Sequence, residues 1–154
     1  MSYGGEEIGL NASYGHRFNQ ELQKAGLRGI SVLVAAGDDG VGCNQQFAKG
    51  KPEAFSPDFP ASFPAITTVG GTDFTSGSGS AETTWSSGGG GFSQLFPRPS
   101  YQDAAVEAFL KDNKGSLPPS SFFHAQGRAC AWQLLLLLLL LLRSDSRPPA
   151  RCLV

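Results

Sequence analysis

The chain has 154 residues, 40% of them hydrophobic, and a formal net charge of −1. This length and apolar content fit one ordinary domain with a packed core, and the charge balance excludes a nucleic-acid-binding surface built on clustered Lys and Arg. The 3 cysteines (Cys43, Cys130 and Cys152) lack metal-ligand spacing, so no metal site is predicted. Met1 is followed at once by polar and glycine residues, so no signal peptide is predicted.

The N-terminal part predicts a strand end followed by an amphipathic helix. Ser2-Tyr3-Gly4-Gly5 is typical of the last residues of a strand. Apolar residues then recur every three or four positions, at Leu10, Tyr14, Phe18, Leu22 and Ala25. Asn11 or Ser13 is the expected N-cap, and Gly26 or Gly29 the expected end. Asn11-Ala12-Ser13 also matches the N-glycosylation acceptor pattern, a short match that matters only in a secretory compartment.

Residues 30–36 form a continuous run of small and β-branched apolar residues, which predicts a strand buried on both faces of a parallel sheet. Strand, helix and strand together predict a βαβ crossover, with both strand ends, near Gly4 and Gly37, at one edge. Asp38 and Asp39 follow Gly37, and ligands of open α/β sheets bind at that edge. The alternative is a solvated Asp-Asp-Gly turn, which uses these residue types for backbone reasons.

Further along, residues 45–64 are expected to be irregular and residues 65–69 to form a second buried strand. Residues 75–81 should be an exposed loop. Four consecutive glycines at 88–91 indicate either flexibility or the close approach of another backbone. No Gly-Lys-Ser/Thr ending follows them, so a phosphate loop is disfavoured. Ser100 with Asp103 predicts a capping box at the start of a second helix.

Several of these segments together resemble the sedolisins, acid-acting serine peptidases with a subtilisin-like fold. The segments occur in the family's order and at about its spacing: Ala36-Gly37-Asp38-Asp39-Gly40, Phe59-Pro60-Ala61-Ser62-Phe63-Pro64, Thr67-Thr68-Val69-Gly70-Gly71-Thr72, Ser87-Gly88-Gly89-Gly90 with Phe92-Ser93, Phe96-Pro97-Arg98-Pro99-Ser100-Tyr101-Gln102 and Leu117-Pro118-Pro119-Ser120-Ser121. The resemblance implies an α/β fold, a subtilisin-like parallel sheet with flanking helices, incomplete at both ends. Residues 1–129 would be this partial peptidase domain.

The resemblance also implies roles for particular residues. Asp38 matches the aspartic acid that points into the oxyanion hole, and it can donate a hydrogen bond there only when protonated. Ser2, Tyr3 and Gly4 match an edge segment with which substrate backbone pairs, and Gly37 is expected to contact substrate beside it. The family has Ser or a similar residue where this chain has Asp39, and a nearby second carboxylate is expected to disfavour ionisation of Asp38.

The implied activity is the release of tripeptides from the free N-termini of peptide or protein substrates, in the lysosome. We expect no nucleic-acid partner, no membrane span and no cofactor in this chain. The family's nucleophilic serine, its glutamate base and its calcium site have no counterpart in this sequence, so we expect the isolated chain to be inactive.

Residues 134–142 are nine consecutive leucines. This run is too short for a membrane span and lies at the wrong end for a signal peptide. Residues 130–154 are therefore expected to be an unrelated low-complexity and disordered tail. A non-enzymatic fragment that binds extended peptides at residues 2–4 is the alternative function; an unrelated nucleotide-binding α/β protein is disfavoured by the missing lysine.

Overall fold

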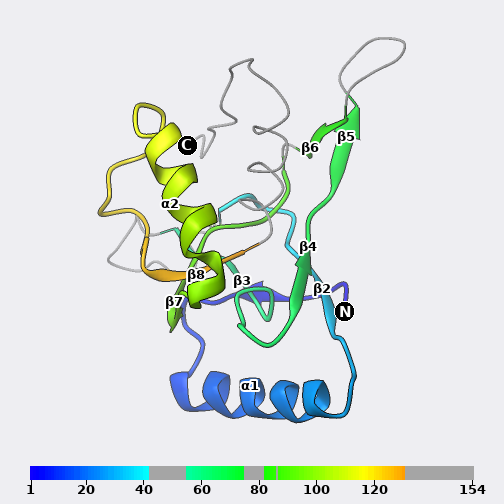
Figure 1. Ribbon diagram of the computed structural model, residues 1–154. Coiled ribbons are helices and arrows are strands. Elements are labelled where there is room, and N and C mark those ends of the chain that lie inside the picture. The colour runs from blue at the N-terminus through cyan, green and yellow to red at the C-terminus, as the bar shows by residue number, and fades with distance from the viewer. Residues whose placement is uncertain (42–54, 75–81, 86, 131–154) are drawn as a thin grey trace.

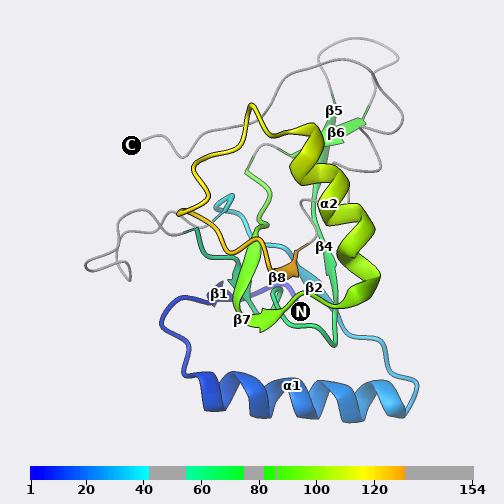
Figure 2. The same ribbon diagram turned by 60° about the vertical axis from the view of Figure 1, so that its left-hand side comes forward.

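The computed structural model describes residues 1–41, 55–74, 82–85 and 87–130. Figures 1 and 2 show the longer helix along one side of the strands and the shorter helix on another. In chain order the elements are β1 (Gly5–Glu6), α1 (Ala12–Leu27), β2 (Leu33–Ala35), β3 (Asp58–Phe59), β4 (Thr67–Val69), β5 (Thr72–Phe74), β6 (Glu82–Thr84), β7 (Phe92–Pro97), the 3-10 helix η1 (Ser100–Gln102), α2 (Asp103–Asp112) and β8 (Gly127–Ala129).

The predicted crossover is confirmed in part. Strand β2 pairs with β4 in parallel, with Val34 opposite Thr68. On the other edge of β2, the amino group of Met1 donates to the Leu33 carbonyl at 2.8 Å and the Ala35 amide donates to the Met1 carbonyl at 3.0 Å. This alternation is that of a parallel ladder, so the first residue runs alongside β2 and α1 connects the two.

The prediction of a strand buried on both faces is wrong. Strand β2 covers only part of residues 30–36, and its central Val34 is 3% exposed whereas Leu33 is 56% exposed. Val34 faces the core under α1, while Leu33 and Val69 lie on the opposite face, half exposed. The continuous apolar run therefore has one covered face in the part of the chain that the structure describes.

Helix α1 begins as the sequence predicts. The Asn11 side chain accepts a hydrogen bond from the Tyr14 amide at 3.1 Å, and this N-cap satisfies one of the free donors of the first turn. The chain leaves the helix through Gly29, which has φ of +77°, a left-handed conformation that glycine adopts without steric cost.

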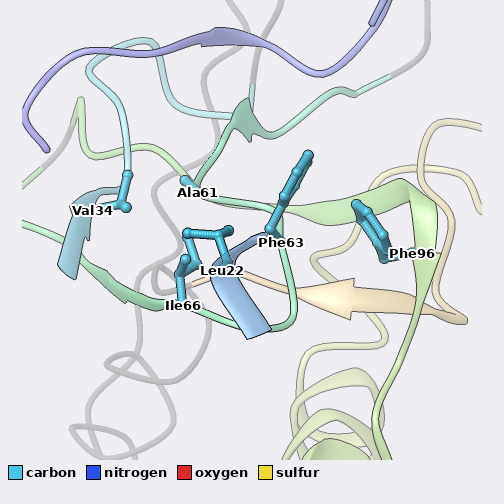
Figure 3. Close-up of a cluster of buried hydrophobic side chains, with 6 residues drawn as sticks. All are labelled: Leu22, Val34, Ala61, Phe63, Ile66 and Phe96. Atoms are coloured by element: carbon cyan, nitrogen blue, oxygen red, sulfur yellow. The ribbon is translucent and has the colours of Figure 1, made fainter. Parts of the chain in front are cut away.

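The main core lies between α1 and the strands. Figure 3 shows side chains from α1, β2, β7 and the segment between β3 and β4 meeting there. Its buried members are Leu22, Val34, Ala61, Phe63, Ile66 and Phe96. The rings of Phe63 and Phe96 are 4.6 Å apart at their centroids and tilted by 64°, a favourable edge arrangement.

Helix α2 starts differently from the prediction. Its N-cap is Gln102, without a side-chain cap, after the 3-10 turn of η1. Asp103 does not complete a capping box, because its carboxylate accepts from Arg98 Nε at 2.7 Å. Val106 and Phe109 are the buried residues of this helix, and Val106 packs with Phe92 and Ala129 in a second cluster.

The remaining described ladders, β1–β3, β5–β6 and β7–β8, are antiparallel. The predicted parallel sheet is thus confirmed only for β4, β2 and the first residue. Strand β3 was not expected within the irregular segment 45–64. Residues 75–81, predicted to be a loop, lie outside the described residues. In the described chain, no helix has the length and apolar character that crossing a bilayer needs.

Candidate functional site

Strand β3 brings the two predicted substrate-binding segments together. A Cβ placed on Gly4 would overlap the Phe59 carbonyl oxygen and lie 3.3 Å from its carbon. A Cβ placed on Gly37 would overlap the carboxylate of Asp58, with Asp58 Cγ at 2.8 Å. Adjacent residues of β3 therefore contact Gly4 and Gly37, which puts residues 2–4 and the Asp38 loop on the same short strand.

The glycine run packs on this loop from another direction. The Gly89 amide donates to the Gly37 carbonyl at 2.7 Å, and the Gly90 amide donates to the Gly40 carbonyl at 3.0 Å. A Cβ on Gly89 would overlap the Ala36 carbonyl and lie 2.8 Å from Gly37 Cα. Of the two interpretations of the run, close approach of another backbone is the correct one.

The side chains predicted to carry chemistry are accessible. Asp38 and Asp39 are exposed on the loop beyond β2, and Ser2, Tyr3 and Gly4 are exposed beside it, with Tyr3 91% exposed. An open, largely apolar hollow of about 520 Å³ lies next to Ser2 and is lined also by Met1, β2 and the end of β4 at Gly70 and Gly71. This edge is open to a ligand in the described structure.

Asp58 is a residue of this region that the sequence analysis missed. Its carboxyl group is half buried against Gly37, and its pKa is raised above its usual value by burial and, next, by the negative charges of Asp39 and Asp38. No local pattern marks Asp58, which lies in the proline-rich segment interpreted as irregular. Its proximity to Gly37 is a consequence of tertiary structure.

Buried polar side chains support the elements around the site. Glu7 is 4% exposed; it accepts from Ser93 Oγ at 2.6 Å and from the Gln94 amide at 2.5 Å, which joins β1 to β7. Arg128 is also 4% exposed, and its guanidinium donates to the Ala61 carbonyl at 2.7 Å. These side chains satisfy backbone and hydroxyl groups in the core.

The other residues named in the sequence analysis lie in ordinary structural surroundings or outside the described residues. Asn11 is exposed and caps α1, which leaves its glycosylation a prediction. Cys130 is fully buried, and burial raises the pKa of its thiol to about 12. Cys43, Cys152 and the leucine run at 134–142 lie outside the described residues. Among described side chains, no group of three or more His, Cys, Asp or Glu residues could hold a metal ion.

The chain is similar to known proteins over most of its length. The chain is 48% identical over 130 residues to tripeptidyl-peptidase 1 of Homo sapiens and of Pongo abelii, and 47% identical to that of Bos taurus. Each match covers 84% of this chain and 22% of the relative, so the chain spans about a fifth of the relatives' length. No family model matches the chain.

A solved structure shares the fold. Pseudomonas sedolisin, a serine-carboxyl proteinase solved with pseudo-iodotyrostatin, matches with a TM-score of 0.55 and 24% identity over 84% of this chain and 34% of that chain. At this identity the match shows a subtilisin-like fold and no more. The sequence relatives agree with this fold match: over its matched part, this chain is similar to about a fifth of tripeptidyl-peptidase 1.

Proposed function

We propose that this chain is part of an acid-acting serine peptidase that releases tripeptides from the free N-termini of peptide or protein substrates, in the lysosome. Residues 1–129 are the peptidase portion in this proposal, and residues 130–154 an unrelated tail. The single observation that supports it best is the convergence of Gly4, Gly37 and Gly89, which sets the Asp38 loop beside an exposed backbone edge at residues 2–4.

In the proposed reaction Asp38 serves the oxyanion hole. A protonated Asp38 donates a hydrogen bond to the oxygen that becomes negative when the peptide carbonyl is attacked; an ionised carboxylate has no proton to donate. Acid conditions are therefore part of the mechanism. One such donor is typically worth about 3–4 kcal/mol of barrier. Ser2, Tyr3, Gly4 and Gly37 hold the substrate backbone as an added strand.

The nucleophilic serine, the general base and the calcium site of the family are assigned to residues that this sequence does not contain. A serine peptidase without nucleophile and base keeps only a small part of its rate enhancement. The isolated chain is therefore proposed to be inactive, and purified protein that cleaves a tripeptide reporter in acid would overturn this part of the proposal.

A chimaeric enzyme tests the role of Asp38. Residues 1–129 replace the matching segment of a tripeptidyl-peptidase 1, and turnover of a tripeptide reporter is measured in acid. The chimaera should be active, and its Asp38→Ala form, which has no donor at this position, should lose about a hundredfold to a thousandfold in kcat. The matched control is Asp112→Ala, on the exposed end of α2, which should keep its activity. A fully active Asp38→Ala enzyme would refute the assignment.

Peptide binding without catalysis is the second candidate, favoured by the exposed edge at residues 2–4 and the hollow beside it. Calorimetry with an extended peptide distinguishes the two. Binding by this chain together with an inactive chimaera would favour the binding module; an active chimaera favours the peptidase.

A further inference from the structure

Gly37, the residue before Asp38, is enclosed on two sides. The carboxyl group of Asp58 occupies the space where a side chain at position 37 would lie, and the Gly89 backbone lies against the same Cα. Gly37 has φ of +107°, a backbone conformation that favours glycine independently of these contacts. The direction in which the chain enters Asp38 is therefore set by what packs on Gly37.

We propose that Asp58 is a positioning residue for Asp38: its neutral carboxyl group packs on the Gly37 backbone and holds the loop, and its ionisation weakens that contact. This rests on the proposed function, in which Asp38 serves the oxyanion hole. It adds a residue from β3 that acts on Asp38 through the backbone rather than by touching substrate.

The charge state of Asp58 matters because of its neighbours on the loop. Burial favours the neutral carboxyl group, and Asp39 and Asp38 disfavour a third negative charge nearby. Their effect is to raise the pKa of Asp58, so Asp58 takes up its proton at a higher pH than an exposed aspartate does. In acid the group on Gly37 is uncharged.

Within the described part of the chain, no positive charge offsets the effect of burial, Asp39 and Asp38 on the pKa of Asp58. Glu6 of β1 lies opposite Asp58 in the β1–β3 register and carries a carboxylate of its own. Beyond β8, the Cys130 thiol carries no charge in this pH range, and burial raises its pKa to about 12. The cation on β8, Arg128, donates to the carbonyls of Ala61 and Ile66 and is not among the groups that shift the pKa of Asp58.

Nuclear magnetic resonance of the whole chain tests the proposal without any need for turnover. The side-chain carboxyl carbon of Asp58 and the amides of Gly37 and Gly89 are followed from neutral to acid pH. The Gly89 amide reports the contact because it donates to the Gly37 carbonyl at 2.7 Å. Both glycine amides should shift with the midpoint of Asp58, which should lie above the usual value of an aspartate side chain.

In Asp58→Asn both amides should lose this pH dependence and stay near their acid-form positions, because the amide side chain keeps the shape of the neutral acid. Asp112→Asn should leave the titration unchanged. A second variant covers failure of Asp58→Asn to fold: Asp39→Asn removes a charge near Asp58, so the midpoints of Asp58 and of the Gly89 amide should fall together.

Glycine amides that do not titrate with Asp58, or that keep titrating in Asp58→Asn, would overturn the proposal. A fully active Asp38→Ala chimaera alongside a normal Asp58 titration would instead refute the proposed function and leave the coupling of Asp58 to Gly37 intact. The two failures are therefore distinguishable.

Discussion

Replacement of Glu7 by leucine should destabilise the protein strongly. Glu7 lies between β1 and α1, is 4% exposed, and accepts from Ser93 Oγ at 2.6 Å and from the Gln94 amide at 2.5 Å. Leucine fills a similar volume but leaves both donors without an acceptor. Each unpaired buried donor costs about 1–3 kcal/mol, so the expected loss is about 4 kcal/mol. This is a large part of a typical domain's total stability.

Glu7→Gln keeps the shape of the side chain and removes its carboxylate. The glutamine oxygen retains one acceptor, while its NH2 group faces a second donor, so we expect a loss of about 2 kcal/mol. Urea unfolding followed by far-ultraviolet circular dichroism gives both values. The control is Glu107→Ala on α2, where the side chain is 72% exposed and 3.9 Å from Arg98; exposed pairs of this kind contribute at most about 1 kcal/mol.

A double-mutant cycle checks the cause. If Glu7 acts through the Ser93 hydroxyl, Glu7→Gln and Ser93→Ala should be coupled by about 1.5–3 kcal/mol. A loss below about 1 kcal/mol for Glu7→Leu, or additive effects in the cycle, would show that the buried pair does not join β1 to β7 as argued.

Further predictions concern backbone contacts, the helix cap and pH. Gly89→Ala should lower the free energy of unfolding by about 3 kcal/mol or more, because its Cβ would overlap the Ala36 carbonyl. Gly26→Ala has nothing within 4 Å of its Cβ and should stabilise the end of α1 by about 0.5–1 kcal/mol. Thermal unfolding measures both effects. Asn11→Ala should lower stability by about 1 kcal/mol through the lost N-cap, visible in urea unfolding. The folded-state pKa of Asp58 is raised, so its stabilising contribution is complete below its unfolded pKa and is lost as pH rises through the folded pKa. Asp58→Asn should flatten this part of the profile of unfolding free energy against pH. An unchanged profile would contradict the raised pKa.

Local patterns predicted the elements whose causes are local. Helix α1 and its N-cap follow from the three-to-four-residue spacing and from Asn11. Yet Tyr14 on the predicted apolar face is 54% exposed, while Gly15 and Asn19 are buried. The three-to-four-residue spacing predicts that the helix has one buried face. It does not predict which residues lie at the middle of that face, which is set here by the close packing of Gly15 against Leu95.

The errors came from contacts that the local pattern did not include. Asp103 had the spacing of a capping box, but Arg98 binds its carboxylate at 2.7 Å. Residues 30–36 had the composition of a doubly buried strand, but burial of the second face depends on what packs there, which no property of the strand itself encodes. Asp58 had no recognisable motif because its relation to Gly37 exists only once β3 lies beside the loop that follows β2.

The candidate site consists of a backbone frame and of separate acidic side chains. Its frame consists of backbone contacts at glycines: Gly4 on β3, Gly37 on Asp58, and Gly89 on Ala36 and Gly37. A side chain at any of these three positions would move the segments apart, so the geometry of the loop depends on the absence of side chains there. The acids that give the loop its chemistry, Asp38 and Asp39, are exposed and make no part of that frame. Their charges act on the frame only through Asp58, whose pKa they raise. A change at Asp58, whose carboxyl group contacts the Gly37 backbone, should therefore alter loop position and protonation together.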